Sequence, residues 1–264
     1  MSIKKFLYNV KLIRLVYFKF LRPLRNQRDI NLYLLKNYKF GLSLDVGANK
    51  GLYSLELEKI SNEVIIFEPL KSMFKDLEIL LKKKTKKFNY ALGNSFCNKK
   101  IKIPILNNSL SYGRATLTNR FKEYKSKITK VRKLDYLLKK KKIYKVNKKV
   151  DFIKIDVEGY EENVIYGAKK LIKKDKPIIL IELELRILGN KKIKRIFNFF
   201  EKLNYNVFYT DNGISLKSTK FNDLKNFQRN SNFKKDILFK RRLKKGEKRY
   251  YISNFWFIPK KKYE

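Results

Sequence analysis

The side chains best suited to chemistry stand where apolar segments of this 264-residue chain end. Asp45 closes one such segment, and Gly47 and Gly51 follow it in the sequence LDVGANKG. Glycine at both places lets the backbone approach a ligand closely and enter a helix without a Cβ clash. The spacing matches neither the dinucleotide fingerprint nor a phosphate loop, so pyrophosphate binding is not indicated. A carboxylate beside such a turn suits a cationic or amine-bearing ligand.

A second carboxylate ends the next apolar segment. Glu68 closes VIIFEP and lies 23 residues after Asp45. A carboxylate about 20 residues beyond a glycine turn is where α/β proteins hold the two hydroxyls of a ribose. The glycine turn and Glu68 together predict a ligand that contains adenosine.

A third group of carboxylates lies in DFIKIDVEGYEENVIYGA. Period-two alternation places Asp156 and Glu158 on one side of a strand at its carboxyl end, where open parallel sheets bind ligands. Two carboxylates that point together indicate a cationic or protic group between them. Glu161 and Glu162 are better explained as acids at a helix N-terminus. We expect Lys154 to point to the opposite face and to be structural.

Several catalytic classes are excluded by composition. The chain has no histidine and one cysteine, Cys97. It therefore has no Ser-His-Asp or Cys-His triad, no histidine-ligated metal and no thiolate zinc cluster. Catalysis has to use carboxylates, Lys, Tyr, Ser or Thr, the backbone, or a cofactor.

From residue 40 onward, short apolar strands alternate with helical segments, which is typical of a parallel sheet covered by helices. Residues 101–105, IKIPI, alternate around Pro104 and suit an edge strand. The expected strands are 41–46, 64–67, 88–92, 152–157, 178–183, 206–210 and 254–258, and the expected helices are 52–60, 72–84, 161–173 and 191–203.

The expected organisation is an N-terminal basic amphipathic helical extension, residues 1–39, and one domain, 40–264, with a basic insertion at about 217–250. The formal net charge of +41 indicates anionic partners or a bias toward A/T-rich codons. In residues 3–22, basic side chains gather on one half of a helical wheel, which suits either an anionic membrane surface or packing on the domain. No apolar run is long enough to cross a membrane, so we expect a cytoplasmic protein, peripheral at the inner face of the membrane.

Several motifs together resemble the FkbM-family methyltransferases over residues 40–258: LDVGANKG, VIIFEP, YALG, KLDYLL, FIKIDVEGYEENVIYGA, PIILIELE and NFWFIP. The resemblance implies a Rossmann-like class I fold, a mostly parallel seven-stranded sheet with helices on both faces, and S-adenosylmethionine as cofactor. It also implies that Asp45, Gly47, Asn49 and Gly51 form the cofactor turn, that Glu68 holds the ribose and that Ala91 borders the adenine.

The expected reaction is methylation of a hydroxyl group on a sugar, glycan or related small molecule. We expect Glu158 to act as general base and Asp156 to orient the cofactor or acceptor, with Glu182 and Glu184 as further candidate bases. We assign no metal site, although a divalent ion held by Asp156, Glu158 and Glu182 is an alternative.

Two other functions stay open at the level of sequence. The charge of +41 is compatible with an RNA methyltransferase, although no RNA-binding module is attached. A protein that binds membranes or glycans without turnover is the other alternative, and the intact cofactor motifs argue against it.

Overall fold

The structure is a computed structural model, and it describes residues 29–139, 148–232 and 245–260. The amphipathic segment 3–22 and part of the 217–250 insertion lie outside the described residues, so both interpretations stay predictions. No helix within the described ranges is both long and apolar enough to span a bilayer.

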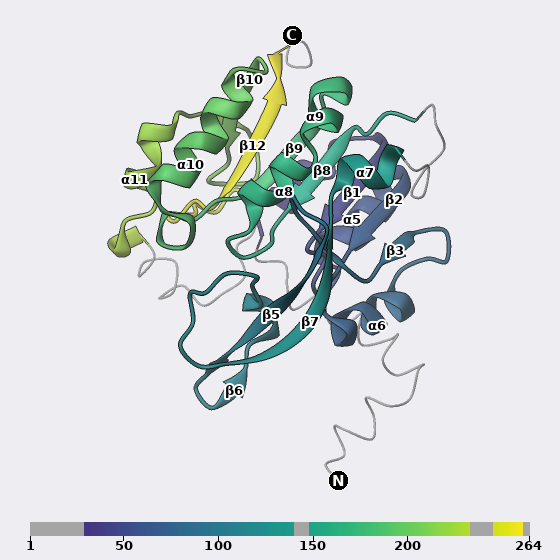
Figure 1. Ribbon diagram of the computed structural model, residues 1–264. Helices are drawn as coiled ribbons and strands as arrows, with labels where there is room; N and C mark the ends of the chain where they lie inside the picture. The colour runs from purple at the N-terminus through teal and green to yellow at the C-terminus, as the bar shows by residue number, and fades with distance from the viewer. Residues whose placement is uncertain (1–28, 140–147, 233–244, 261–264) are drawn as a thin grey trace.

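The centre of the fold is one large, mostly parallel sheet (Figure 1). Its strands are β1 (Phe40–Val46), β2 (Ser61–Phe67), β3 (Lys86–Phe88), β8 (Phe152–Ile155), β9 (Ile178–Glu182), β10 (Tyr205–Tyr209), β11 (Lys217–Ser218) and β12 (Asn254–Pro259). Their order is β11-β10-β12-β9-β8-β1-β2-β3, with β12 antiparallel to both of its neighbours. The expected class I sheet is confirmed. The count is eight because two residues of the insertion, β11, pair with the end of β10.

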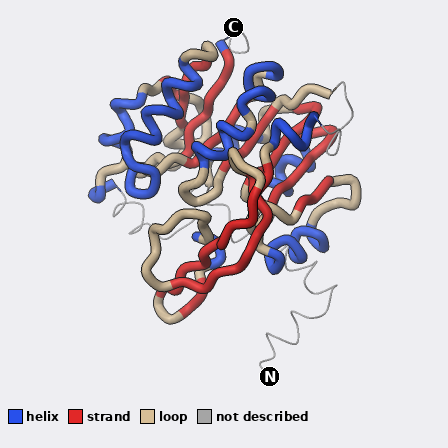
Figure 2. Tube along the Cα trace, viewed as in Figure 1, coloured by secondary structure: helices blue, strands red, loops and turns tan. Residues whose placement is uncertain are grey.

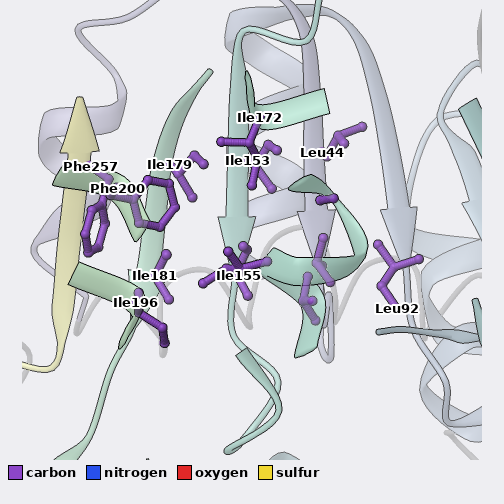
Figure 3. Packing of buried hydrophobic residues seen from close by; sticks show 14 of the residues in the cluster. Leu44, Leu92, Ile153, Ile155, Ile172, Ile179, Ile181, Ile196, Phe200 and Phe257 are labelled. Carbon is purple, nitrogen blue, oxygen red and sulfur yellow. The ribbon is translucent and has the colours of Figure 1, made fainter. Parts of the chain in front are cut away.

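Helices cover both faces of this sheet, as expected. Alternate residues of β2 show why, since Ile65 and Phe67 join one apolar cluster and Val64 and Ile66 join the other. Figure 3 shows the first cluster, in which Ile179 of the sheet lies close to Phe200, and Ile153 lies close to Ile172. The helices that contribute to the first cluster are α7 (Leu134–Lys139), α8 (Glu161–Gly167), α9 (Lys169–Asp175), α10 (Leu185–Glu201) and α11 (Leu224–Phe227), and those of the second are α4 (Asn31–Leu35), α5 (Leu52–Ile60) and α6 (Lys71–Leu80).

The short helix α4 packs on the domain although it precedes the first strand. Leu32, Leu34 and Leu35 are buried in the second cluster. The side-chain oxygen of Asn31 accepts a hydrogen bond of 2.7 Å from the indole N–H of Trp256 in β12. Residues 31–35 therefore contribute to the core, while the boundary at residue 39 stays a prediction.

A second, four-stranded sheet lies beside the main one (Figure 2). Its strands are β4 (Ala91–Leu92), β5 (Cys97–Leu106), β6 (Ser109–Leu110) and β7 (Tyr124–Arg132), in the order β4-β7-β5-β6. The segment IKIPI is consequently an inner strand and not an edge strand. The partner β7 was not expected from the sequence, because YKSKITKVR is rich in lysine and its burial alternates only over its last residues.

Two expected elements are divided in the structure. The strand expected at 88–92 is split between the two sheets, because the side chain of Asn89 donates to the carbonyl oxygens of Glu68 and Pro69 at 2.8 and 3.2 Å. The helix expected at 161–173 is split at Ala168 into α8 and α9. A Cβ on Gly167 would lie 1.9 Å from the carbonyl oxygen of Gly93, so the end of α8 packs directly on backbone.

Candidate active site

The turn after β1 forms the floor of the site. Gly47 has φ +84°, and its N–H donates to the carbonyl oxygen of Phe67 at 3.0 Å. A Cβ at Gly47 would lie 1.9 Å from the carbonyl oxygen of Asp156. Only glycine fits both the backbone angle and this approach. The contact brings the ends of β1, β2 and β8 together at the carboxyl edge of the sheet.

A cavity opens at this edge, lined by residues of the turn, of the strand ends and of the second sheet. Five of the residues expected at the site line its wall: Gly47, Asn49, Glu68, Ala91 and Asp156. Much of the remaining wall is apolar or aromatic, as in Leu70, Met73, Tyr90, Ile101, Tyr112 and Tyr160. A planar base fits such a wall, and a polar tail fits the side of the glycine turn.

Glu68 is the most enclosed carboxylate of the cavity wall, with 4% of its surface exposed. Its Oε1 accepts the N–H of Leu70 at 2.8 Å, and its Oε2 accepts the N–H of Asn49 at 2.7 Å. Burial raises the pKa of Glu68 to about 7, against the lowering effect of these two hydrogen bonds. Each carboxylate oxygen can accept a further bond, so the group can still receive two hydroxyls of a ribose.

Asn49 fits the polar part of the expected cofactor. Its backbone has φ +46°, and its side-chain Oδ1 is buried without a hydrogen-bond partner in the described part of the chain. A buried amide oxygen without a donor is costly. An ammonium or hydroxyl donor on a ligand in this cavity would satisfy it, which agrees with the amino-acid end of S-adenosylmethionine.

Asp45 and Gly51 are not in the cavity wall. Asp45 is 2% exposed and accepts a hydrogen bond from the hydroxyl of Ser54 in α5. Burial raises the pKa of Asp45 to about 6, while the Ser54 hydroxyl and Lys154 act in the opposite direction. Gly51, with φ +78°, directly precedes α5, and a Cβ placed on it would lie 2.8 Å from Leu77. Both residues shape the turn, and direct contact between either one and the cofactor stays a prediction.

Three carboxylates meet at the ends of β8 and β9. One oxygen from each of Asp156, Glu158 and Glu182 lies within 4.8 Å of the other two. Two cations offset this charge. The ammonium of Lys154 is 3.9 Å from Asp156, and the guanidinium of Arg120 pairs with Glu158. The sequence correctly predicted that these carboxylates lie together. It did not predict that Lys154 and Arg120 lie beside them.

Glu158 has the environment of a group that exchanges protons near neutral pH. Its backbone is left-handed, with φ +57°, and its carbonyl oxygen accepts the hydroxyl of Thr116 at 2.7 Å. Burial raises the pKa of Glu158 to about 7, and the nearby Asp156 adds to that effect, while Arg120 opposes it. A base with a pKa near the working pH suits proton removal.

The prediction that Lys154 points away from Asp156 is wrong. Residues two apart on a strand share a face, and the register places Lys154 beside Asp45 of β1. The side chain is 2% exposed, bonds to the Oδ1 of Asn254 at 3.1 Å and lies 4.9 Å from the ring centre of Tyr53. Lys154 is thus a buried cation beside the carboxylates. Burial and the adjacent Asp156 raise the pKa of Glu182 well above its usual range, and Lys154 limits that rise.

Sequence reasoning also missed residues that the second sheet brings to the site. Tyr112 lies in the wall of the cavity, and Arg120 lies 38 residues before its partner Glu158. The only signal in the sequence was their position between two segments with recognisable motifs. Tyr160 could have been found, because it follows the DVEG motif directly.

The family follows from comparison with known proteins. A model of the methyltransferase FkbM domain matches residues 45–207, which include the turn, Glu68 and the three carboxylates. The chain belongs to the FkbM methyltransferase family. Its matched part is a methyltransferase domain, and the cofactor is S-adenosylmethionine. A comparison with curated proteins gives no match.

The solved structures to which this FkbM-family chain is similar share little sequence with it. The methyltransferase FkbM of Methylobacillus flagellatus KT is 14% identical, with a TM-score of 0.47 over 82% of this chain and 43% of that one. This chain thus spans less than half the length of that protein. Precorrin-6y C5,15-methyltransferase of Geobacter metallireducens GS-15 is 12% identical, with a TM-score of 0.39 over 73% and 81%. The plantazolicin methyltransferase BpumL, in complex with SAH, is 12% identical, with a TM-score of 0.44 over 97% and 98%.

Proposed function

We propose that this protein is an O-methyltransferase that acts on a hydroxyl group of a sugar, glycan or related small molecule. The observation that carries the proposal is the pair at the end of β8. Asp156 lines the cofactor cavity, and Glu158 stands two residues further on with a pKa raised to about 7 by burial. A hydroxyl acceptor has to lose a proton, and the pair offers a base beside the cofactor.

Different residues bind the cofactor and orient the reacting groups. When bound, S-adenosylmethionine supplies an electrophilic methyl group on a sulfonium. Glu68 and Asn49 would hold the ribose and the amino-acid end of this cofactor, in the same cavity wall as Asp156 at the end of β8. Asp156 orients the cofactor or the acceptor, because in-line placement of the reacting atoms supplies much of the rate.

Glu158 takes the proton from the acceptor hydroxyl. Arg120 pairs with it and stabilises the ionised form, which is the form that acts as a base. Gly159, next to Glu158, is closely packed, because a Cβ placed there would lie 2.8 Å from Ile187 of α10.

The experiment is a transfer assay with radiolabelled S-adenosylmethionine and a panel of cell-envelope sugars. Glu158→Gln keeps the size of the side chain and removes the base. We expect turnover of a hydroxyl acceptor to fall by about 10²- to 10⁴-fold, with nearly unchanged affinity for the demethylated cofactor. Asp156→Asn should lower both turnover and cofactor affinity.

Glu162→Gln is the matched control. Glu162 carries the same group four residues further along, but it pairs with Arg195 of α10 through two hydrogen bonds, at 2.6 and 3.0 Å. This variant should keep full turnover. If Glu158→Gln also keeps full turnover, then Glu158 is not the base, and Glu182 is the next residue to change. Labelling of RNA or of an amine, with no labelling of any hydroxyl compound, would refute the proposed acceptor class.

We also propose that residues 3–22 contact anionic membranes peripherally. Support comes from the basic half of their helical wheel alone.

A further inference from the structure

The second sheet has two unlike faces. The inner face carries Ile101, Ile103 and Val131, which are buried, and Ile101 lines the cofactor cavity. Lys99 on this face donates to the hydroxyl of Tyr160 at 3.0 Å. The outer face is formed by the alternate residues Asn98, Lys100, Lys102, Ser126, Ile128 and Lys130. The sheet projects beside the main sheet (Figure 1).

The outer face is basic and contains no carboxylate of its own. Of the seven basic residues of strands β5 and β7, Lys100, Lys102, Lys130 and Arg132 alternate onto this face, and neither strand carries an acidic residue. The register places Lys100 opposite Ile128, Asn98 opposite Lys130, and Lys102 opposite Ser126. Side chains opposite each other are about 5 Å apart, so these lysines surround Ile128 closely.

Apolar side chains are exposed on and beside the same face. Ile128 is 75% exposed, more than any other large hydrophobic residue that the structure describes. Tyr124 is 38% exposed on β7, and Phe96, just before β5, is 47% exposed. Phe96 packs edge-to-face on Tyr136 of α7, with ring centres 4.5 Å apart. Four of the six exposed large hydrophobic residues in the described ranges therefore belong to this region.

Protection of a free strand edge explains only part of this pattern. Strand β7 pairs with β4 through Val131 and Arg132 alone, so lysines on the rest of its edge prevent unwanted strand pairing. On the side away from β7, strand β5 pairs with β6 only through Ile105 and Leu106, so the edge at Lys100 is open as well and its charge protects it. An exposed isoleucine gives no such protection, so the exposure of Ile128 needs another explanation.

We propose that the outer face of the β5–β7 sheet binds the surface of an anionic phospholipid bilayer. Lysines attract the acidic headgroups, and Ile128 enters the boundary between headgroups and acyl chains. Single-stranded nucleic acid fits this face less well. It requires open aromatic rings for stacking, and the ring of Tyr124 is covered by the ammonium of Lys102 at 4.5 Å. This contact does not depend on the proposed acceptor or on residues 3–22.

The test is co-sedimentation of the full chain with vesicles of phosphatidylcholine, with and without phosphatidylglycerol. We expect binding only to the anionic vesicles, and Lys100→Gln combined with Lys130→Gln should weaken it by about 30-fold. Ile128→Ser in the wild-type background leaves the charge unchanged. We expect it to weaken vesicle binding as well, because the apolar side chain at the membrane boundary is lost. The matched control combines Lys173→Gln with Lys194→Gln, which removes two exposed lysines from α9 and α10.

Three results would overturn the proposal. The wild type could fail to prefer anionic vesicles. The outer-face variant could bind as tightly as the wild type, which would assign any membrane contact to another part of the chain. The outer-face variant could lose binding to single-stranded RNA while keeping vesicle binding, which would identify a different partner. Unchanged affinity for the demethylated cofactor shows that each variant is folded.

Discussion

Replacing Glu68 with glutamine tests the assignment of the ribose site directly. The carboxylate accepts the N–H of Leu70 on one oxygen and the N–H of Asn49 on the other. Glutamine keeps one acceptor oxygen and turns its NH₂ group toward the other backbone donor. The variant therefore loses a charge-assisted bond to the ligand and leaves one backbone N–H of the site without its acceptor.

The expected loss can be estimated from these contacts. A hydrogen bond to a charged group contributes about 1.5–3 kcal/mol, which corresponds to about 10- to 150-fold in Kd. The pKa of Glu68 is raised to about 7 by burial, so the carboxylate ionises as the pH rises from 6 to 8. Wild-type affinity should increase over this interval. The variant should not show that increase, so the difference between the two proteins should grow with pH.

The assay is titration calorimetry with the demethylated cofactor at pH 6, 7 and 8. Glu63→Gln is the matched control, because Glu63 lies on β2, the strand that Glu68 directly follows, and pairs with Lys148 away from the cavity. Thermal unfolding of both variants shows that they fold. Unchanged affinity of Glu68→Gln, or an equal loss in Glu63→Gln, would refute the ribose assignment.

Three further predictions concern stability and metal dependence. Gly167→Ala should lower stability by about 1–3 kcal/mol in thermal unfolding, because its Cβ would lie 1.9 Å from a backbone oxygen; an unchanged Tm would contradict this. Burial raises the pKa of Asp45 to about 6 and that of Glu161 to about 7. The folded state therefore binds more protons than the unfolded state, and stability from these groups is lost as pH rises from about 4 to about 7. Urea unfolding at pH 5 and pH 8 checks this, and greater stability at pH 8 would count against it. Chelation should leave turnover unchanged, because Lys154 and Arg120 already supply positive charge to the carboxylates; restoration of lost activity by Mg²⁺ would show the opposite.

The local pattern of the chain determined most of the main sheet. Helix α5 begins and ends at residues 52 and 60, as expected from its amphipathic pattern and the preceding Gly51. The expected strands at 41–46, 64–67, 178–183 and 254–258 all occur, with ends that differ by at most three residues. These elements are short apolar runs between turn residues, and their burial follows directly from composition. The carboxylates at strand ends were predictable for the same reason.

Contacts between distant segments decided the rest. The strand expected at 88–92 divides because Asn89 bonds to carbonyl groups 20 and 21 residues earlier. Arg120 meets Glu158 only because the second sheet returns to the main one. The strands of the second sheet are rich in lysine, so their composition does not reveal the apolar residues of their inner face.

By itself, the sequence determined the class of fold, the cofactor turn, and which carboxylates stand at the edge of the sheet, because these depend on local periodicity and on glycine at fixed positions. Only the tertiary structure decided which of them face the cavity. Glu68 and Asp156 line it, whereas Asp45 is buried under the turn against Ser54. Burial and neighbouring charges also set the raised pKa of Glu158, and both are properties of packing that no local pattern contains.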